Sequence, residues 1–166
     1  KKDHRIIHMT LNEIVDNSII DPDSVLNSEV IGVMRNPLER QLSLFFFLSK
    51  EFKLNNTSVG EFRKQFINGH HISDSNNAIT QSDYLKLGDD MVGKFWLYED
   101  IQENLRQFVS DHGVKLKEDL KNYKSNYRTR RDDSLIDEYY DATTRAAVED
   151  YYAEDFKIYR ELKGED

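Results

Sequence analysis

The feature that most constrains the fold is a short apolar run that passes directly into a proline-started helix. Residues 30–34 (VIGVM) are continuously apolar and of strand length, which is typical of a strand buried on both faces of a parallel sheet. Residues 36–39 (NPLE) follow as a cap residue, a first-turn proline and an acidic residue three positions after the cap. We therefore expect a strand that ends in Arg35 and a helix that continues to about Phe52.

Strand and helix patterns alternate along the rest of the chain. Residues 94–98 (KFWLY) predict a second buried strand, and residues 101–109 place apolar side chains at helical spacing before Gly113. Residues 59–67 predict a further helix within the polar stretch 53–90, which otherwise reads as short helices and loops. This alternation indicates an α/β fold with helices packed over a parallel sheet.

Local signals refine the element boundaries. Residues 10–13 (TLNE) have the spacing of a capping box, as do Asp100 and Glu103. Residues 21–24 (DPDS) predict a turn. Apolar side chains recur at helical spacing from Asp141 onward, which predicts one long amphipathic helix at the end of the chain.

The composition excludes several classes of protein. The chain has 166 residues, 38% of them hydrophobic, which suits one domain with its own core. A net charge of −8 argues against nucleic acid as a partner, and no apolar run approaches the roughly 18 residues of a membrane span. Because there is no cysteine, we expect no disulfide, no thiolate metal site and a cytoplasmic or other reducing compartment.

The strand–helix junction has the chemistry of an anion site. A helix N-terminus favours anions through its free amides and its dipole, and Arg35 adds a planar guanidinium suited to phosphate. On a helical wheel, Asn36, Arg40 and Ser43 fall within about 60° of one another, away from the apolar face. A capped helix with an incidental arginine and a solvated polar face explains the same residues, and the residues alone leave both interpretations open.

Residues 35–43 (RNPLERQLS) resemble the 3′-phosphate-binding motif of sulfotransferases. Further stretches resemble segments of carbohydrate sulfotransferases, in the same order along the chain: residues 81–85 (QSDYL), 95–101 (FWLYEDI) and 139–156. The resemblance implies that Arg35 and Ser43 bind the 3′-phosphate of the donor, whereas Arg40 braces the local structure.

The resemblance also implies a fold, an activity and a substrate. The fold would be a three-layer parallel-sheet nucleotide-binding fold, formed by residues 1–166 as a single domain. The activity would be transfer of a sulfuryl group from 3′-phosphoadenosine 5′-phosphosulfate, leaving 3′-phosphoadenosine 5′-phosphate, to a hydroxyl of a carbohydrate or other small alcohol. No metal is implied, and the sequence has no metal-ligand spacing.

A basic stretch at residues 121–131 interleaves five cations with tyrosines. In the sulfotransferases that the chain resembles, the loop before the last helix supplies cations to the 3′-phosphate, and Lys124, Ser125 and Arg128 are the nearest matches here. The same stretch can instead be a solvated basic loop. Single-stranded nucleic acid would also suit basic residues among aromatic ones, but the acidic net charge opposes it.

Histidine suits the base that takes the acceptor's proton, because its pKa lies near neutrality. His8 ends a β-prone run ahead of a capped helix, and its segment resembles the catalytic-histidine segment of polysaccharide 2-O- and 6-O-sulfotransferases. The resemblance therefore implies that His8 is the base. A histidine that serves only the local fold remains the alternative, and Glu13 is expected to serve the capping box.

One expected feature is missing from the sequence. Sulfotransferases carry near their start a strand and a loop with a Lys or Arg beside small residues, which wraps the 5′-phosphosulfate, and no such clustered loop occurs here. Either the loop lies upstream in a longer protein or catalysis has been lost. The alternative function is thus a non-catalytic nucleotide- or glycan-binding domain on the same fold. A kinase would need a phosphate-binding loop and magnesium ligands, and the sequence has neither.

Overall fold

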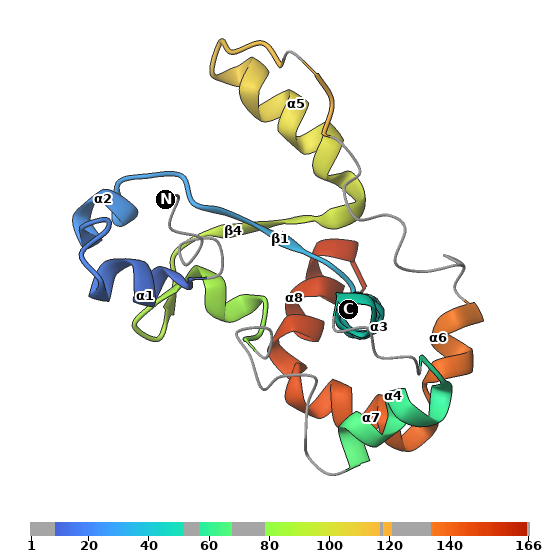
Figure 1. Cartoon of the computed structure of the whole chain (residues 1–166). Helices are drawn as coiled ribbons and strands as arrows, with labels where there is room; N and C mark the ends of the chain where they lie inside the picture. The colour runs from blue at the N-terminus through green and yellow to red at the C-terminus, as the bar shows by residue number, and fades with distance from the viewer. Residues whose placement is uncertain (1–8, 52–56, 68–78, 117, 121–133, 166) are drawn as a thin grey trace.

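The computed structural model describes residues 9–51, 57–67, 79–116, 118–120 and 134–165. The described chain is rich in helix and contains a small parallel sheet, which is compatible with the predicted α/β class (Figure 1). The helices are α1 (Leu11–Asp16), α2 (Pro22–Leu26), α3 (Pro37–Glu51), α4 (Val59–Ile67), α5 (Ile101–Asp111), α6 (Ser134–Tyr139), α7 (Ala142–Tyr151) and α8 (Ala153–Lys163), with short 3₁₀ turns η2 (Ser82–Leu85) and η3 (Tyr98–Asp100).

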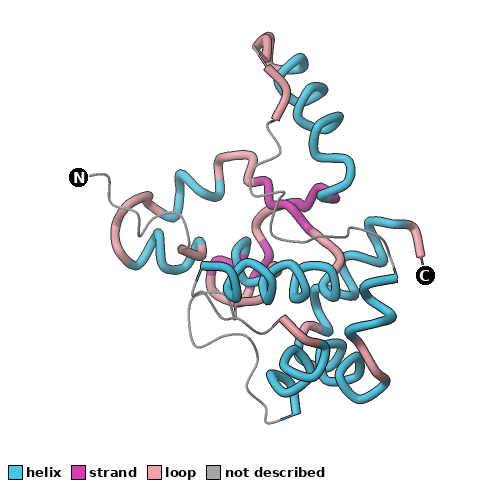
Figure 2. Tube along the Cα trace, turned by 45° about the vertical axis from the view of Figure 1, so that its right-hand side comes forward, coloured by secondary structure: helices cyan, strands magenta, loops and turns pink. Residues whose placement is uncertain are grey.

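Two strands predicted from the sequence form the parallel sheet. β1 (Ile31–Met34) pairs with β4 (Lys94–Leu97) in a register that places Val33 opposite Trp96. A short antiparallel pair, β2 (Lys86–Leu87) with β3 (Asp90–Met91), was not anticipated in the polar stretch. In Figures 1 and 2 the β1–β4 pair lies between α5, which projects away, and the C-terminal helices.

The expectation that both faces of β1 are buried is wrong for the described chain. Met34 and Phe95 are buried on the face that packs against α8 and η2, whereas Val33 on the opposite face is 38% exposed. Gly32 allows the close packing on the buried face, because a Cβ there would lie 2.7 Å from the Phe95 ring. The continuous apolar run therefore predicts the strand correctly but does not predict that one of its faces is exposed.

The main hydrophobic core is helical and aromatic. α3 turns Leu38, Leu42, Phe45 and Ser49 inward. Phe62 of α4 is fully buried at the centre of this core, with ring centroids 5.2 Å from Phe45 and 4.9 Å from Tyr140 in edge-to-face contacts. Such edge-to-face pairs add to the stabilisation that burial itself gives.

The predicted single C-terminal helix is instead two helices. α7 and α8 are separated at Tyr152, whose backbone leaves helical geometry at φ −103° and ψ 29°. The break has a packing reason, since α7 packs on α4 in the aromatic core whereas α8 packs on β1 and β4. One straight helix could not reach both surfaces, so tertiary contacts override a continuous helical pattern.

The local predictions have mixed outcomes. The capping box of α1 is present, with Thr10 and Glu13 satisfying each other's amides, and α5 stops before Gly113, which has a φ of 67°. The predicted turn at residues 21–24 is the start of α2, capped by Asp21. Asp100 makes no side-chain cap, because the preceding η3 turn leaves its backbone at φ −101° and ψ 4° rather than extended. Among the described residues, no helix is long and apolar enough to cross a membrane.

Candidate functional site: the strand–arginine–helix junction

Arg35 lies where the sequence predicted, between the carboxyl end of β1 and the start of α3. Because β4 runs parallel to β1, it ends at the same edge of the sheet and delivers Tyr98 beside Arg35, with the guanidinium carbon 5.2 Å from the ring centroid. Tyr98 is 47% exposed. The junction therefore presents a cation and an accessible aromatic ring at the edge where open α/β sheets bind ligands.

The guanidinium of Arg35 has a carboxylate partner in the first turn of α3, the helix that begins two residues later. Its Nη2 lies 2.8 Å from Oε2 of Glu39, and the Arg35 side chain keeps 25% of its surface exposed. An incoming anion would have to share the guanidinium with Glu39 or displace it. A guanidinium has five donors, so one carboxylate contact leaves capacity for another oxyanion.

The amides at the start of α3 are already satisfied, contrary to the expectation of free donors there. Oδ1 of Asn36 accepts from Leu38 N at 2.9 Å and from Glu39 N at 3.3 Å. Pro37 has no amide hydrogen, and Arg40 N already donates to the Asn36 carbonyl. The cap residue that the sequence predicted thus occupies the donors that would have held an anion, which leaves Arg35 and the helix dipole as the attraction.

The other residues of the motif are partly accounted for. Ser43 is half-buried on α3, two turns beyond Arg35. Arg40 turns to a structural contact, since its Nη2 donates to the carbonyl of Ile79 at 3.0 Å and its guanidinium carbon lies 6.0 Å from the Tyr152 ring centroid. This agrees with the bracing role predicted for Arg40. His8, Lys124, Ser125 and Arg128 lie outside the described residues.

Gln81, which precedes η2, forms two hydrogen bonds with the backbone of Arg35. Its Oε1 accepts from Arg35 N at 2.9 Å and its Nε2 donates to the Arg35 carbonyl at 2.9 Å. The side-chain amide therefore pairs with residue 35 as a neighbouring strand would, one residue beyond the end of β1. Gln81 is 7% exposed, so water competes little for these two hydrogen bonds.

Asp155 of α8 holds Gln81 in turn. This carboxylate is fully buried and accepts from Gln81 N at 2.8 Å, from Ser82 N at 2.8 Å and from Gln81 Nε2 at 3.4 Å. Buried carboxylates need such donors to offset their desolvation. Sequence reasoning assigned no role to Gln81 or Asp155, although both fall inside the stretches that carry the resemblance.

A second contact fastens α8 near Tyr98. The hydroxyl of Tyr159 donates to Oε1 of Glu99 at 3.0 Å. Burial, followed by this hydrogen bond to a carboxylate, raises the pKa of Tyr159 to about 12. The turn that presents Tyr98 is thus tied to the same helix that supplies Asp155.

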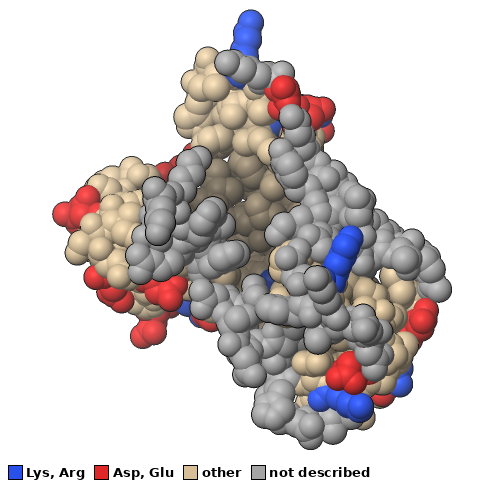
Figure 3. Space-filling model, viewed as in Figure 1, with Lys and Arg blue, Asp and Glu red and all other residues tan. Residues whose placement is uncertain are grey.

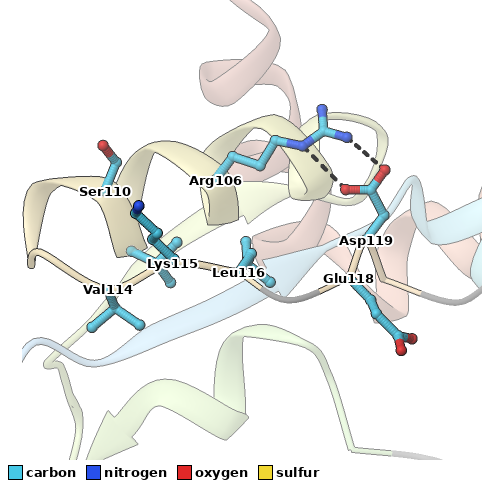
Figure 4. Close-up of a pocket in the computed structure, with 8 residues that line it drawn as sticks. Arg106, Ser110, Val114, Lys115, Leu116, Glu118 and Asp119 are labelled. Atoms are coloured by element: carbon cyan, nitrogen blue, oxygen red, sulfur yellow. Dashed lines mark hydrogen bonds and ion pairs between the residues drawn. The ribbon is translucent and has the colours of Figure 1, made fainter.

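Two hollows lie along α5, away from the motif residues. One, of about 500 Å³, is bounded by Arg106, Lys115 and Asp119 with apolar side chains between them (Figure 4). Its arginine is paired with Asp119 at 2.7 Å, and that hydrogen bond raises the pKa of Arg106. The other, of about 210 Å³, lies against Trp96 and Phe108. In the view of Figure 3, uncharged side chains line the hollow middle of the face, and the coloured charged ones lie mostly toward its outside.

Comparisons with protein-family models, with curated proteins and with solved structures each found no match. Across the described ranges, no group of three or more His, Cys, Asp or Glu side chains could hold a metal ion. The function must therefore be argued from the chemistry of the junction itself.

Proposed function

We propose that this chain is the 3′-phosphate-binding part of a sulfotransferase, which transfers a sulfuryl group from 3′-phosphoadenosine 5′-phosphosulfate to a hydroxyl acceptor, a carbohydrate being the favoured class. One observation carries the proposal: Arg35 and the exposed Tyr98 meet at the carboxyl edge of two parallel strands. A guanidinium beside an aromatic face suits a ligand that joins a phosphate to a planar base.

The proposed fold extends what the described chain contains. β1 and β4 would be two strands of a larger parallel sheet, with α8 and η2 on one face and a further layer on the face where Val33 is 38% exposed. Parallel sheets are normally covered on both faces. A three-layer fold would thus use the apolar surface of β1 that the described residues leave open.

Several residues of the motif would each contact the nucleotide. Arg35 would bind the 3′-phosphate through the guanidinium donors that Glu39 leaves, and Ser43 would add a hydroxyl. Lys124, Ser125 and Arg128, which precede α6 in the sequence, would add contacts to the same phosphate. Because Asn36 satisfies the first amides of α3, we assign the phosphate to side chains rather than to the helix N-terminus.

The transfer is an in-line displacement at sulfur. The acceptor oxygen forms a bond to sulfur while the bond from sulfur to the 5′-phosphate oxygen breaks, and the acceptor's proton passes to a base. His8 is the proposed base. The leaving phosphate oxygen requires a cation for its developing charge, and a loop of the kind that supplies it in the sulfotransferases that the chain resembles is missing from the sequence.

That missing loop favours one alternative function. A domain that binds a nucleotide or glycan without transferring sulfate would need Arg35 and Tyr98 but no leaving-group cation. It predicts binding of 3′-phosphoadenosine 5′-phosphate and no transfer, even with the loop supplied. The two functions thus share the nucleotide site and differ in the chemistry at its 5′ end.

Thermal unfolding with two nucleotides tests the proposal. At about 100 times its dissociation constant, 3′-phosphoadenosine 5′-phosphate should stabilise the chain by roughly 2.7 kcal/mol, which raises Tm by about 5–10 °C for a domain of this size. Adenosine 5′-monophosphate, which has no 3′-phosphate, should give a much smaller rise at the same concentration.

Two arginine variants give the matched control. Arg35→Ala should abolish the difference between the nucleotides, whereas Arg106→Ala, which removes an equally carboxylate-paired cation from α5, should preserve it. Equal shifts with both nucleotides in the unsubstituted chain would contradict a 3′-phosphate site. Loss of the difference in Arg106→Ala alone would move the nucleotide to the α5 hollow.

A further inference from the structure

We propose that Gln81 and Asp155 are positioning residues that set the backbone of Arg35, and so fix where its guanidinium is presented. The inference rests on the proposed function for its ligand, but its geometry does not. Gln81 contacts both the amide and the carbonyl of Arg35, and Asp155 contacts Gln81 in turn. Neither residue is assigned a contact with the nucleotide.

The Gln81 side chain pairs with the backbone of Arg35. β1 ends at Met34, so residue 35 has lost the strand neighbour that would fix its backbone. The Gln81 side chain replaces that neighbour with two hydrogen bonds of 2.9 Å. The direction in which a side chain leaves the backbone follows from the backbone's own orientation. Gln81 therefore governs the direction of the Arg35 guanidinium from 46 residues away in sequence.

Asp155 in turn holds Gln81 in place. One carboxylate oxygen accepts from the Gln81 amide and the other from the Ser82 amide, both at 2.8 Å. Charge-assisted hydrogen bonds of this kind, buried from water, are stronger than neutral ones. Because Asp155 belongs to α8, the docking of the C-terminal helix determines the position of the Gln81 amide.

The orientation of Arg35 affects how tightly it binds a phosphate. Phosphate recognition by a guanidinium depends on direction, since its donors lie in one plane. Without Gln81, the Arg35 amide and carbonyl lose their partners at a partly buried position, and the local backbone must shift to find others. The affinity for a 3′-phosphate should then fall although no ligand contact has been removed.

The first test measures binding of 3′-phosphoadenosine 5′-phosphate by calorimetric titration, well below Tm. Gln81→Met, which keeps the length of the side chain and removes both hydrogen bonds, should raise Kd about tenfold, the cost of roughly one to two hydrogen bonds. Added to Arg35→Ala, the same change should alter Kd less than about twofold, because its effect acts through Arg35. A residue that only stabilises the fold would add its loss in both backgrounds.

A matched control is available on α5. Gln102 also spans a backbone amide and a carboxylate, accepting from Leu120 N at 2.7 Å and donating to Asp119 at 3.2 Å. Gln102→Met repeats the chemical change away from Arg35 and should leave Kd unchanged. An equal loss of affinity in both methionine variants, or no loss in Gln81→Met, would overturn the inference.

The second test needs no nucleotide and therefore separates this inference from the proposed function. Hydrogen exchange of the Arg35 amide in the unsubstituted chain should be as slow as that of amides inside α3, and at least tenfold faster in Gln81→Met. If the Arg35 amide of the unsubstituted chain exchanges rapidly, Gln81 does not hold it and the inference fails, even if Gln81→Met cannot be folded. Slow exchange without nucleotide binding would retain the positioning and reject only the ligand.

Discussion

The aromatic core and the junction are held together by different kinds of interaction. Phe62, Phe45 and Tyr140 fill the first region with edge-to-face rings and almost no exposed surface. In the second region, Asp155 and Gln81 form a buried polar chain that ends on the backbone of Arg35, whose side chain is 25% exposed. Apolar packing stabilises many similar arrangements, whereas a satisfied polar network specifies one. The comparison indicates that the aromatic core mainly stabilises the fold, whereas the polar network at the junction fixes the position of Arg35.

The largest expected effect comes from emptying the centre of the core. Phe62→Ala should lower the free energy of unfolding by about 4 kcal/mol, because it leaves a cavity among packed rings. Urea unfolding measures the loss. Under conditions where the variant remains folded, its affinity for 3′-phosphoadenosine 5′-phosphate should equal that of the unsubstituted chain. A small stability loss with a large affinity loss would reverse the roles of the two regions.

Asp155→Asn should come next, at about 3 kcal/mol of stability, since the new amide group faces a backbone donor that then lacks an acceptor. Urea unfolding again measures the loss. The matched control is Asp141→Asn, which changes an N-cap of α7 whose carboxylate accepts from Thr144 N at 2.8 Å. That substitution should cost about 1 kcal/mol or less. Equal losses would mean that burial of Asp155 adds nothing to an ordinary cap.

Removing the ion-pair partner of Arg35 should strengthen nucleotide binding rather than weaken it. Glu39→Gln should tighten binding of 3′-phosphoadenosine 5′-phosphate roughly threefold, because the guanidinium of Arg35 no longer shares its charge with Glu39, and partly exposed ion pairs of this kind are worth about 1 kcal/mol or less. Glu61→Gln removes a similar partner from Lys64 on α4 and should leave Kd unchanged, as titration calorimetry can check. Weaker binding in Glu39→Gln would show that Glu39 orients Arg35 rather than competing for it.

The last prediction concerns the pH dependence of stability at the junction. The pKa of Tyr159 is raised to about 12 in the folded chain, against about 10 in an unfolded one. Its stabilising contribution is therefore complete below about pH 10 and is lost as the pH rises toward 12. Tyr159→Phe should weaken stability slightly at neutral pH and lose less of it between pH 10 and 12. Identical alkaline profiles, followed by urea unfolding at each pH, would contradict the raised pKa.

The parts of the fold that the sequence predicted depend on local signals. The apolar run of β1, the proline at the start of α3 and the glycine after α5 each act within a few residues, and each element lies where expected. The short β2–β3 pair escaped prediction because two residues per strand carry no detectable pattern. The break at Tyr152 escaped because helical spacing continues through it, and only packing on two different surfaces reveals it.

The candidate site divides in the same way. Arg35 was predictable from the motif, whereas its pairing with Glu39 in the first turn of α3 was not anticipated. The contacts of Gln81 with Arg35 and of Asp155 with Gln81 join residues 46 and 74 positions apart. No periodicity or spacing encodes such pairs, since they depend on how α8 returns to the sheet. The sequence therefore locates the cation, and the fold determines how it is held.

Binding of a 3′-phosphate by Arg35 can be measured by titrating two nucleotides against two variants. We expect Arg35→Ala to remove the preference for 3′-phosphoadenosine 5′-phosphate over adenosine 5′-monophosphate and to change stability little. Phe62→Leu should lower stability and keep that preference. If Arg35→Ala retains the preference in a folded protein, the 3′-phosphate is bound elsewhere and Arg35 is not its site.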